Sequence, residues 1–242
     1  IPEGTYDLDI TATSTDPEGN VVSTQGSLPI DTKVALTVDT DAVEGDGIVN
    51  AAERVDGVPL SGTSEPGATV VLTIDGQDLP AATADASGNW TVIVPVALVP
   101  EGTLGLPVTA TATDLAGNTV TASGTLSIDT ENALTIATDD VTADGVVNAA
   151  ERMQGVTLTG TGEPGAAVEV TVNGNRFETT VDGSGNWSIG LSSDVIPAGT
   201  DPLPVTAIST DAAGNQTVAT GAVSVDTETA VTVAPQGLGG DS

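Results

Sequence analysis

The 242-residue chain has neither cysteine nor histidine. Disulfides therefore cannot hold it together, and nucleophilic triads of the Ser-His-Asp or Cys-His type are impossible. Zinc sites built on His or Cys are excluded for the same reason. The chain also has only four aromatic residues, two Trp, one Tyr and one Phe. Paired carboxylates could still serve a glycosidase, but sugar clefts need aromatic platforms, so we do not expect an enzyme.

Basic residues are as scarce as aromatic ones. Four of them face 34 acids, giving a formal charge of −30. This balance excludes nucleic acid as a partner, because phosphate binding needs a basic surface. No apolar run approaches the ~20 residues of a membrane helix, so no membrane insertion is expected. Because 38% of the residues are hydrophobic, the chain should fold, provided that divalent cations or salt relieve its charge repulsion.

The sequence repeats every 97 or 98 residues. Segments 47–68 and 145–166 are identical at 16 of 22 positions, and Trp90 returns as Trp187. Because this period is the length of a small domain, we expect two complete repeats, 33–130 and 131–228. Residues 1–32 match the last third of a preceding repeat, and 229–242 match the start of a following one. The pattern leaves open whether the chain is an excerpt of a longer one or a subunit that assembles with other copies of itself.

Short alternating runs of Thr, Val, Ile and Ala, bounded by Gly, Asp, Asn and Pro, predict β-strands. In the first complete repeat we expect seven: 35–38, 59–63, 69–74, 79–84, 90–94, 107–113 and 119–128. Seven short strands in about 100 residues predict an all-β fold of tandem immunoglobulin-like β-sandwich modules of about seven strands. Single helical turns are expected at 50–54 and 148–152, and both tryptophans are expected to fill the cores.

Alternating strand directions assign the acidic loops to the two ends of each module. One end should carry the loops with Glu65, 85–89 and Asp114 to Asn118, and the other end the long loop 39–53 and the closing Asp129. In a tandem chain, the closing end of one repeat faces the opening end of the next. We therefore expect convergence on a cation at the junction, with ligands drawn from Asp39, Asp41, Asp46, Asn50, Glu53, Asp129, Glu163, Asp211 and Asn215.

A second pattern in these loops also indicates calcium. Asp140, Thr142, Asp144, Asn148 and Glu151 follow the oxygen spacing of a twelve-residue calcium loop, with Gly145 at its sixth position. The first repeat keeps Asp46, Asn50 and Glu53, but has Ala42 at the first position, beside Asp41 and Asp39. The alternative is that these side chains only form turns and helix caps. Turn formation is equally open for Asp31, Asp129 and Asp226, each of which precedes a Thr at the end of a repeat.

Four motifs together resemble a known family. They are V-N-A-A-E, G-T-x-E-P-G, S-G-N-W and D-x-A-G-N, and they resemble the bacterial Ig-like repeats of giant secreted adhesins, including RTX-type biofilm adhesins exported by type I secretion. The resemblance implies an Ig-like fold and Ca2+ at the inter-domain junctions. It also implies an extender at the bacterial cell surface that contacts neighbouring repeats of its own chain. Asp114, Asn118, Asp211 and Asn215 fall in the D-x-A-G-N loop.

Two other functions compete with the extender. A loop at one end of a module could bind a glycan or a protein, although near-identical repeats and few aromatics argue against it. Alternatively, the partial repeats at both ends could make the chain a fibre or sheath subunit assembled by strand exchange.

Overall fold

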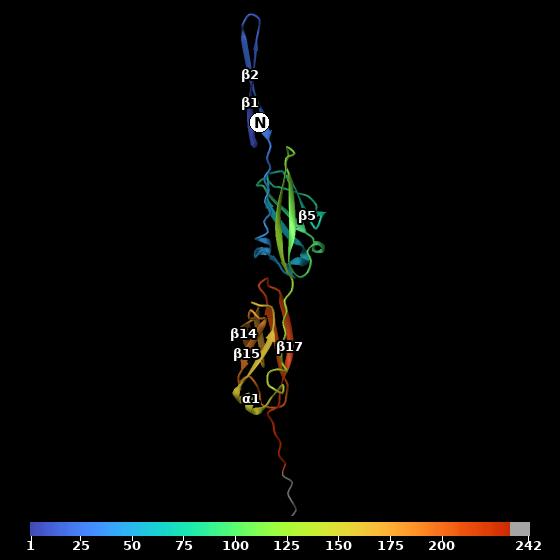
Figure 1. Cartoon of the computed structure of the whole chain (residues 1–242), viewed down its shortest axis with the longest axis vertical. Coiled ribbons are helices and arrows are strands. Elements are labelled where there is room, and N and C mark those ends of the chain that lie inside the picture. Colours follow the sequence, from blue (N-terminus) through green and yellow to red (C-terminus); the bar gives the residue numbers. More distant parts are fainter. Residues whose placement is uncertain (233–242) are drawn as a thin grey trace, which may run out of the picture. The chain divides into compact units, whose positions relative to one another are not determined.

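The computed structural model describes residues 1–232, so most of the predicted start of a following repeat (229–242) lies outside the described residues. The chain divides into two compact units, Ile1–Glu131 and Asn132–Ser242. Figure 1 shows strands dominating both. Each unit contains one β-sandwich, and the first also carries an N-terminal hairpin.

The sandwich of the first unit has two layers. One is the antiparallel pair β4 (Val58–Thr63) and β8 (Asn89–Val94). The other has the order β3 (Ile48–Val49), β10 (Thr119–Asp129), β9 (Thr103–Thr113), β5 (Thr69–Ile74) and β6 (Gln77–Asp78), with β7 (Ala82–Thr83) also paired to β5. Alternating residues of both layers form the core, among them Leu60, Leu72, Trp90, Val92, Val108 and Leu126.

The second unit repeats this plan. The pair β12 (Val156–Thr161) and β15 (Asn186–Leu191) forms one layer. The other has the order β11 (Val146–Val147), β17 (Gln216–Val225), β16 (Leu203–Thr210), β13 (Ala167–Val172) and β14 (Asn175–Thr180). Its core includes Leu158, Val170, Trp187 and Val205. The all-β, immunoglobulin-like sandwich predicted from the strand pattern is therefore confirmed, and both tryptophans lie in the cores.

The N-terminal hairpin joins β1 (Thr5–Thr15) to β2 (Val21–Asp31). Its register, with Leu8 opposite Leu28, matches that of β9 and β10, where Leu106 lies opposite Leu126. In the complete repeat this face is covered by a second layer, and Leu126 is fully buried. In the hairpin Leu8, Ile10 and Leu28 remain 38–47% exposed. The described hairpin thus presents half of a sandwich core.

Two predicted strands do not form as expected, and a third, expected at 107–113, begins earlier, at Thr103. Residues 35–38 form no regular strand: Leu36 makes an isolated bridge to Ser64, and Asp39, just after this segment, makes another to Ser61. The strand expected at 79–84 is replaced by the two-residue strands β6 and β7, because Pro80 has no N–H to donate to a ladder. The second edge strand, β14, contains no proline and runs unbroken for six residues.

Helical turns occur near both predicted positions. In the first unit a 3-10 turn, η2, covers Glu53–Asp56, slightly later than expected. In the second unit helix α1 covers Ala149–Gln154. Two further 3-10 turns, η1 (Val43–Gly45) and η3 (Val96–Leu98), lie in loops of the first unit.

The two repeats attach their first segment differently. In the first repeat Val34 packs, with Val120, against the buried core that contains Ala112. The corresponding residues of the second repeat are Asn132, Thr217 and Ser209. There the Asn132 amide donates to the Ser209 and Asn215 carbonyls (3.2 and 2.7 Å), the Ser209 hydroxyl donates to Asn132 Oδ1, and the Thr217 hydroxyl donates to the Asn132 carbonyl. A polar network replaces an apolar contact.

Candidate metal centre

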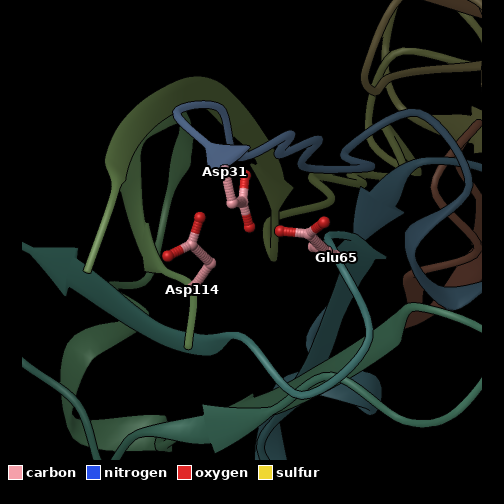
Figure 2. A group of neighbouring side chains, drawn as sticks. All are labelled: Asp31, Glu65 and Asp114. Atoms are coloured by element: carbon pink, nitrogen blue, oxygen red, sulfur yellow. The ribbon is translucent and has the colours of Figure 1, made fainter. Parts of the chain in front are cut away.

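Three carboxylates converge in the first unit. One oxygen each from Asp31, Glu65 and Asp114 lies within 4.8 Å of the other two, and Figure 2 shows the three side chains pointing toward one another. Asp31 is the last residue of β2, Glu65 lies in the turn between β4 and β5, and Asp114 directly follows β9. Strand direction thus brings together acids that are distant in the sequence.

Asp114 is fixed by its own turn. Its Oδ1 accepts the Asn118 backbone N–H (2.8 Å), and its Oδ2 accepts the Asn118 side-chain amide (2.7 Å). Burial alone would raise the pKa of Asp114, but the hydrogen bonds from Asn118, Gly117 and Ala116 outweigh it and lower the pKa. The carboxylate is therefore ionised at neutral pH. The same Asn118 amide also donates to the Asp31 carbonyl (3.2 Å), which ties the end of β2 to this turn.

Glu65 has the opposite electrostatic situation. Its Oε2 is buried and has no hydrogen-bond partner. Burial, followed by the negative charges of Asp31 and Asp114, raises the pKa of Glu65. A buried, unpartnered carboxylate oxygen beside two other acids is costly unless a cation compensates it. Because all three residues offer oxygen ligands, the set suits a hard ion such as Ca2+, which accepts flexible oxygen coordination.

Residues of the second unit reproduce the local parts of this arrangement. Asp211 Oδ1 and Oδ2 accept the Asn215 backbone and side-chain N–H groups, both at 2.8 Å. Glu163 lies in the turn between β12 and β13, as Glu65 lies between β4 and β5. Asp129 ends β10 just as Asp31 ends β2, while Asp226 follows β17 and donates its N–H to the Val147 carbonyl. Within 132–232, the described part of this unit, its own residues contain no group of three converging acids.

The long acidic loop of the first unit uses its side chains for turns and caps. Asp39 Oδ1 accepts the Asp41 N–H, and Asp46 Oδ1 accepts the Ile48 N–H. Asn50 Oδ1 accepts two N–H groups of the following turn, and Glu53 Oε2 accepts the Asn50 N–H. The structure does not bring three carboxylates of this described loop together as it does at Glu65.

The twelve-residue frame of the second unit behaves alike. Asp140 lies in an exposed turn, and Asp144 Oδ1 accepts the Val146 N–H and the Thr142 hydroxyl. Asn148 and Glu151 form a reciprocal capping box at the start of α1. The spacing that predicts a calcium loop is here also the spacing of a turn followed by a capped helix. Calcium binding by these side chains stays a prediction.

Sequence reasoning missed the threonines beside the cluster. The Thr5 hydroxyl donates to Asp31 Oδ1 (3.1 Å), and the Lys33 N–H approaches the same oxygen (3.4 Å). The signal was present in the sequence: a Gly-Thr pair at 4–5, 102–103 and 199–200 accompanies each closing Asp-Thr pair.

In the described residues, no helix is long and apolar enough to cross a membrane.

Comparisons with known proteins place the two repeats in a family. Residues 33–130 match the model of a bacterial Ig-like domain, and 142–226 match that of a bacterial Ig domain. No curated protein matches the chain. One similar solved structure is a Ca2+-stabilised adhesin that helps an Antarctic bacterium reach out and bind ice. It is 33% identical, with 91% of this chain and 57% of that chain covered and a TM-score of 0.49.

Two further structures have related descriptions. One comes from a 1.5-MDa bacterial ice-binding adhesin: 28% identity, 91% and 74% coverage, TM-score 0.49. The other is an immunoglobulin-like domain of the M. primoryensis ice-binding adhesin: 33% identity, 38% of this chain, 95% of that one, TM-score 0.31. The chain spans little more than half of the length of the Ca2+-stabilised adhesin structure described first. From the two family models, which together match most of the chain, the chain belongs to the bacterial immunoglobulin-like domains.

Proposed function

We propose that this chain is an extender segment of a bacterial cell-surface adhesin, with repeats stiffened by calcium at their junctions. In this role it holds an adhesive part away from the cell and supports attachment and biofilm formation. The observation that carries the proposal is the meeting of Asp31, which closes the N-terminal hairpin, with Glu65 and Asp114 of the next repeat.

In such a junction some residues would bind the ion and others would position the ligands. Asp31, Glu65 and Asp114 would hold the ion, which supplies the positive charge that Glu65 Oε2 lacks among the described residues. Asn118 presets two of the ligand residues, through the Asp114 carboxylate and the Asp31 carbonyl. An ion held by acids from both sides of residues 32–33 would restrict rotation there. By repetition, Asp129, Glu163, Asp211 and Asn215 would perform the same roles at the next boundary.

The remaining predicted ligands have a supporting role in this proposal. The acidic loops 39–53 and 139–151 add to the negative field of the molecule, which raises the local concentration of divalent cations. Relatives described as an ice-binding adhesin and a Ca2+-stabilised adhesin support both the extender role and an extracellular location at the cell surface.

Calcium titration of the whole chain tests the proposal. Isothermal titration should detect calcium binding, and Glu65→Gln should weaken one site at least tenfold, because it removes a charged ligand. Asp85→Asn is the matched control: Asp85 begins the same D-x-x-G-N turn in the same unit but lies outside the cluster. Small-angle scattering should show a longer, less variable particle in calcium than in chelator. Identical scattering in both, or equal affinity of the Glu65 variant, would refute the proposal.

One observation favours a second function, a fibre subunit assembled by strand exchange. Among residues 1–232 the hairpin exposes an apolar face, and β1 pairs with β2 alone, whereas β9 pairs with both β10 and β5. A second copy could cover this face. Analytical ultracentrifugation at increasing concentration decides: association abolished by Leu8→Ser with Ile10→Ser supports the fibre, whereas a monomer at all concentrations excludes it.

A further inference from the structure

The same hydrogen-bonded arrangement closes the N-terminal hairpin and both complete repeats. In the first copy Gly4 N–H donates to Thr32 Oγ1 (2.8 Å), and Thr32 N–H donates to the Gly4 carbonyl (3.2 Å). Gly102 with Thr130 and Gly199 with Thr227 form the same two bonds, at 2.8 Å and at 3.2 and 3.0 Å. We call each pair of segments, Gly-Thr against Asp-Thr, the hinge clasp.

The hinge clasp depends on glycine. Gly4, Gly102 and Gly199 have φ values of +134°, +111° and +134°. L-residues with a side chain rarely adopt such a conformation. The glycine therefore determines the backbone conformation at this point. In all three copies the glycine N–H points at the threonine hydroxyl of the opposite segment.

The hinge clasp also holds the closing aspartate. The Thr5 hydroxyl donates to Asp31 Oδ1 (3.1 Å), and the Thr103 hydroxyl donates to Asp129 Oδ1 (2.9 Å). The same oxygen accepts a backbone N–H two residues later, from Lys33 and Glu131 respectively, both at 3.4 Å. Two donors on one oxygen fix the rotation of the carboxylate. For Asp31, that carboxylate is the one that meets Glu65 and Asp114.

We propose that Thr5 and Thr103 are positioning residues that preset the closing carboxylates, Asp31 and Asp129, for the ligand groups of the next repeats. This inference rests on the proposed calcium junctions. Because a preset ligand loses less conformational freedom on binding, each threonine raises the calcium affinity of its own junction without touching the ion. The cost of removing one such hydrogen bond corresponds to about a threefold to tenfold weaker affinity.

The two clasps serve as controls for each other in the whole chain. In an NMR titration with calcium, the Asn118 amide reports on the Asp31 junction and the Asn215 amide on the Asp129 junction, since each donates to the aspartate of its own turn. Thr103→Val should weaken the transition seen at Asn215 and leave that at Asn118 unchanged. Thr5→Val should do the reverse, and Thr5→Ser and Thr103→Ser should restore each affinity. Thr11→Val, in the exposed middle of β1, should change neither.

Three outcomes would overturn the inference. Variants that titrate like the unaltered protein would show that the hydroxyls do not preset the ligands. Variants that weaken both transitions together, with a lower melting temperature in chelator, would show a general structural role instead. If neither amide of the unaltered chain responded to calcium, the proposed calcium junctions themselves would be refuted. This result is distinct from the other two.

Discussion

Gly160 lies where β12 passes the indole of Trp187. A Cβ at this position would stand 2.1 Å from the Thr135 carbonyl and 2.4 Å from the ring. No larger residue fits without moving the backbone, so we expect Gly160→Ala to lower the free energy of unfolding of the second unit by about 1–3 kcal/mol. Urea denaturation followed by tryptophan fluorescence measures it. Gly190→Ala is the control, because an added methyl there meets nothing within 4 Å. Equal stability of both variants would contradict the close contact.

Glu65 should make stability depend on pH in the absence of metal. Burial and the neighbouring acids raise its pKa in the folded state, so folding favours its protonated form. This contribution is present below the unfolded pKa and is lost as pH rises through the folded pKa. In chelator, Glu65→Gln should therefore raise the melting temperature at pH 7 and have little effect near pH 4. In calcium the sign should reverse at pH 7, because the variant loses a ligand. A lower melting temperature in chelator at pH 7 would contradict this.

At the scale of elements, the capping box of α1 distinguishes a cap from a calcium ligand. Asn148 Oδ1 accepts the N–H groups of Ala150 and Glu151 (2.9 and 3.1 Å). Asn148→Ala should cost about 1 kcal/mol of unfolding free energy from the lost cap. Denaturation in chelator and in calcium separates the two roles. An equal loss in both conditions identifies a cap alone, whereas a larger loss in calcium would support the predicted twelve-residue calcium loop.

The strands show how far sequence reasoning reaches. The alternation of apolar and polar residues predicted β5 at its observed bounds. It predicted the ends of β4 and β8 to within one residue, because each of these strands has one buried and one exposed face. It failed at 35–38, where the chain forms no regular strand, and at Pro80. Both failures are on segments at sheet margins, where hydrogen bonding to one neighbour decides the structure and hydrophobic pattern carries little information.

The candidate site was predictable only in part. Strand direction places the Glu65 and Asp114 turns at one end, and the hinge position of Asp31 follows from the repeat. The unpartnered Glu65 oxygen and the Thr5 hydroxyl on Asp31 depend on side-chain orientation, which spacing does not give. In the loops 39–53 and 139–151 the spacing is compatible with two different roles. An Asn three residues before a Glu suits a calcium loop and a helix cap equally.

At the scale of the whole molecule, the large net negative charge should govern how stability depends on salt. With 34 acids against four bases, self-repulsion should oppose folding at low ionic strength. In chelator, raising NaCl from about 0.01 to about 0.15 M should raise the melting temperature, since the screening length falls from about 30 to about 8 Å. Calcium should add a further rise that NaCl of equal ionic strength does not reproduce, as scanning calorimetry can measure. If the two salts were equivalent at equal ionic strength, screening alone would explain the effect.

The different attachment of the first segments bears on misfolding between neighbours. Nearly identical repeats in one chain can exchange segments while they fold. If the segment with Asn132 entered the first sandwich, Asn132 Oδ1 and the Asn132 backbone carbonyl would face Ala112 and Val120, and would lose the hydrogen bonds that the Ser209 and Thr217 hydroxyls donate. If Val34 entered the second sandwich, the fully buried Ser209 hydroxyl would lose its acceptor. Each hybrid leaves polar atoms without the hydrogen bonds they make in their own repeat, so three side chains per repeat make adjacent copies poor substitutes for one another.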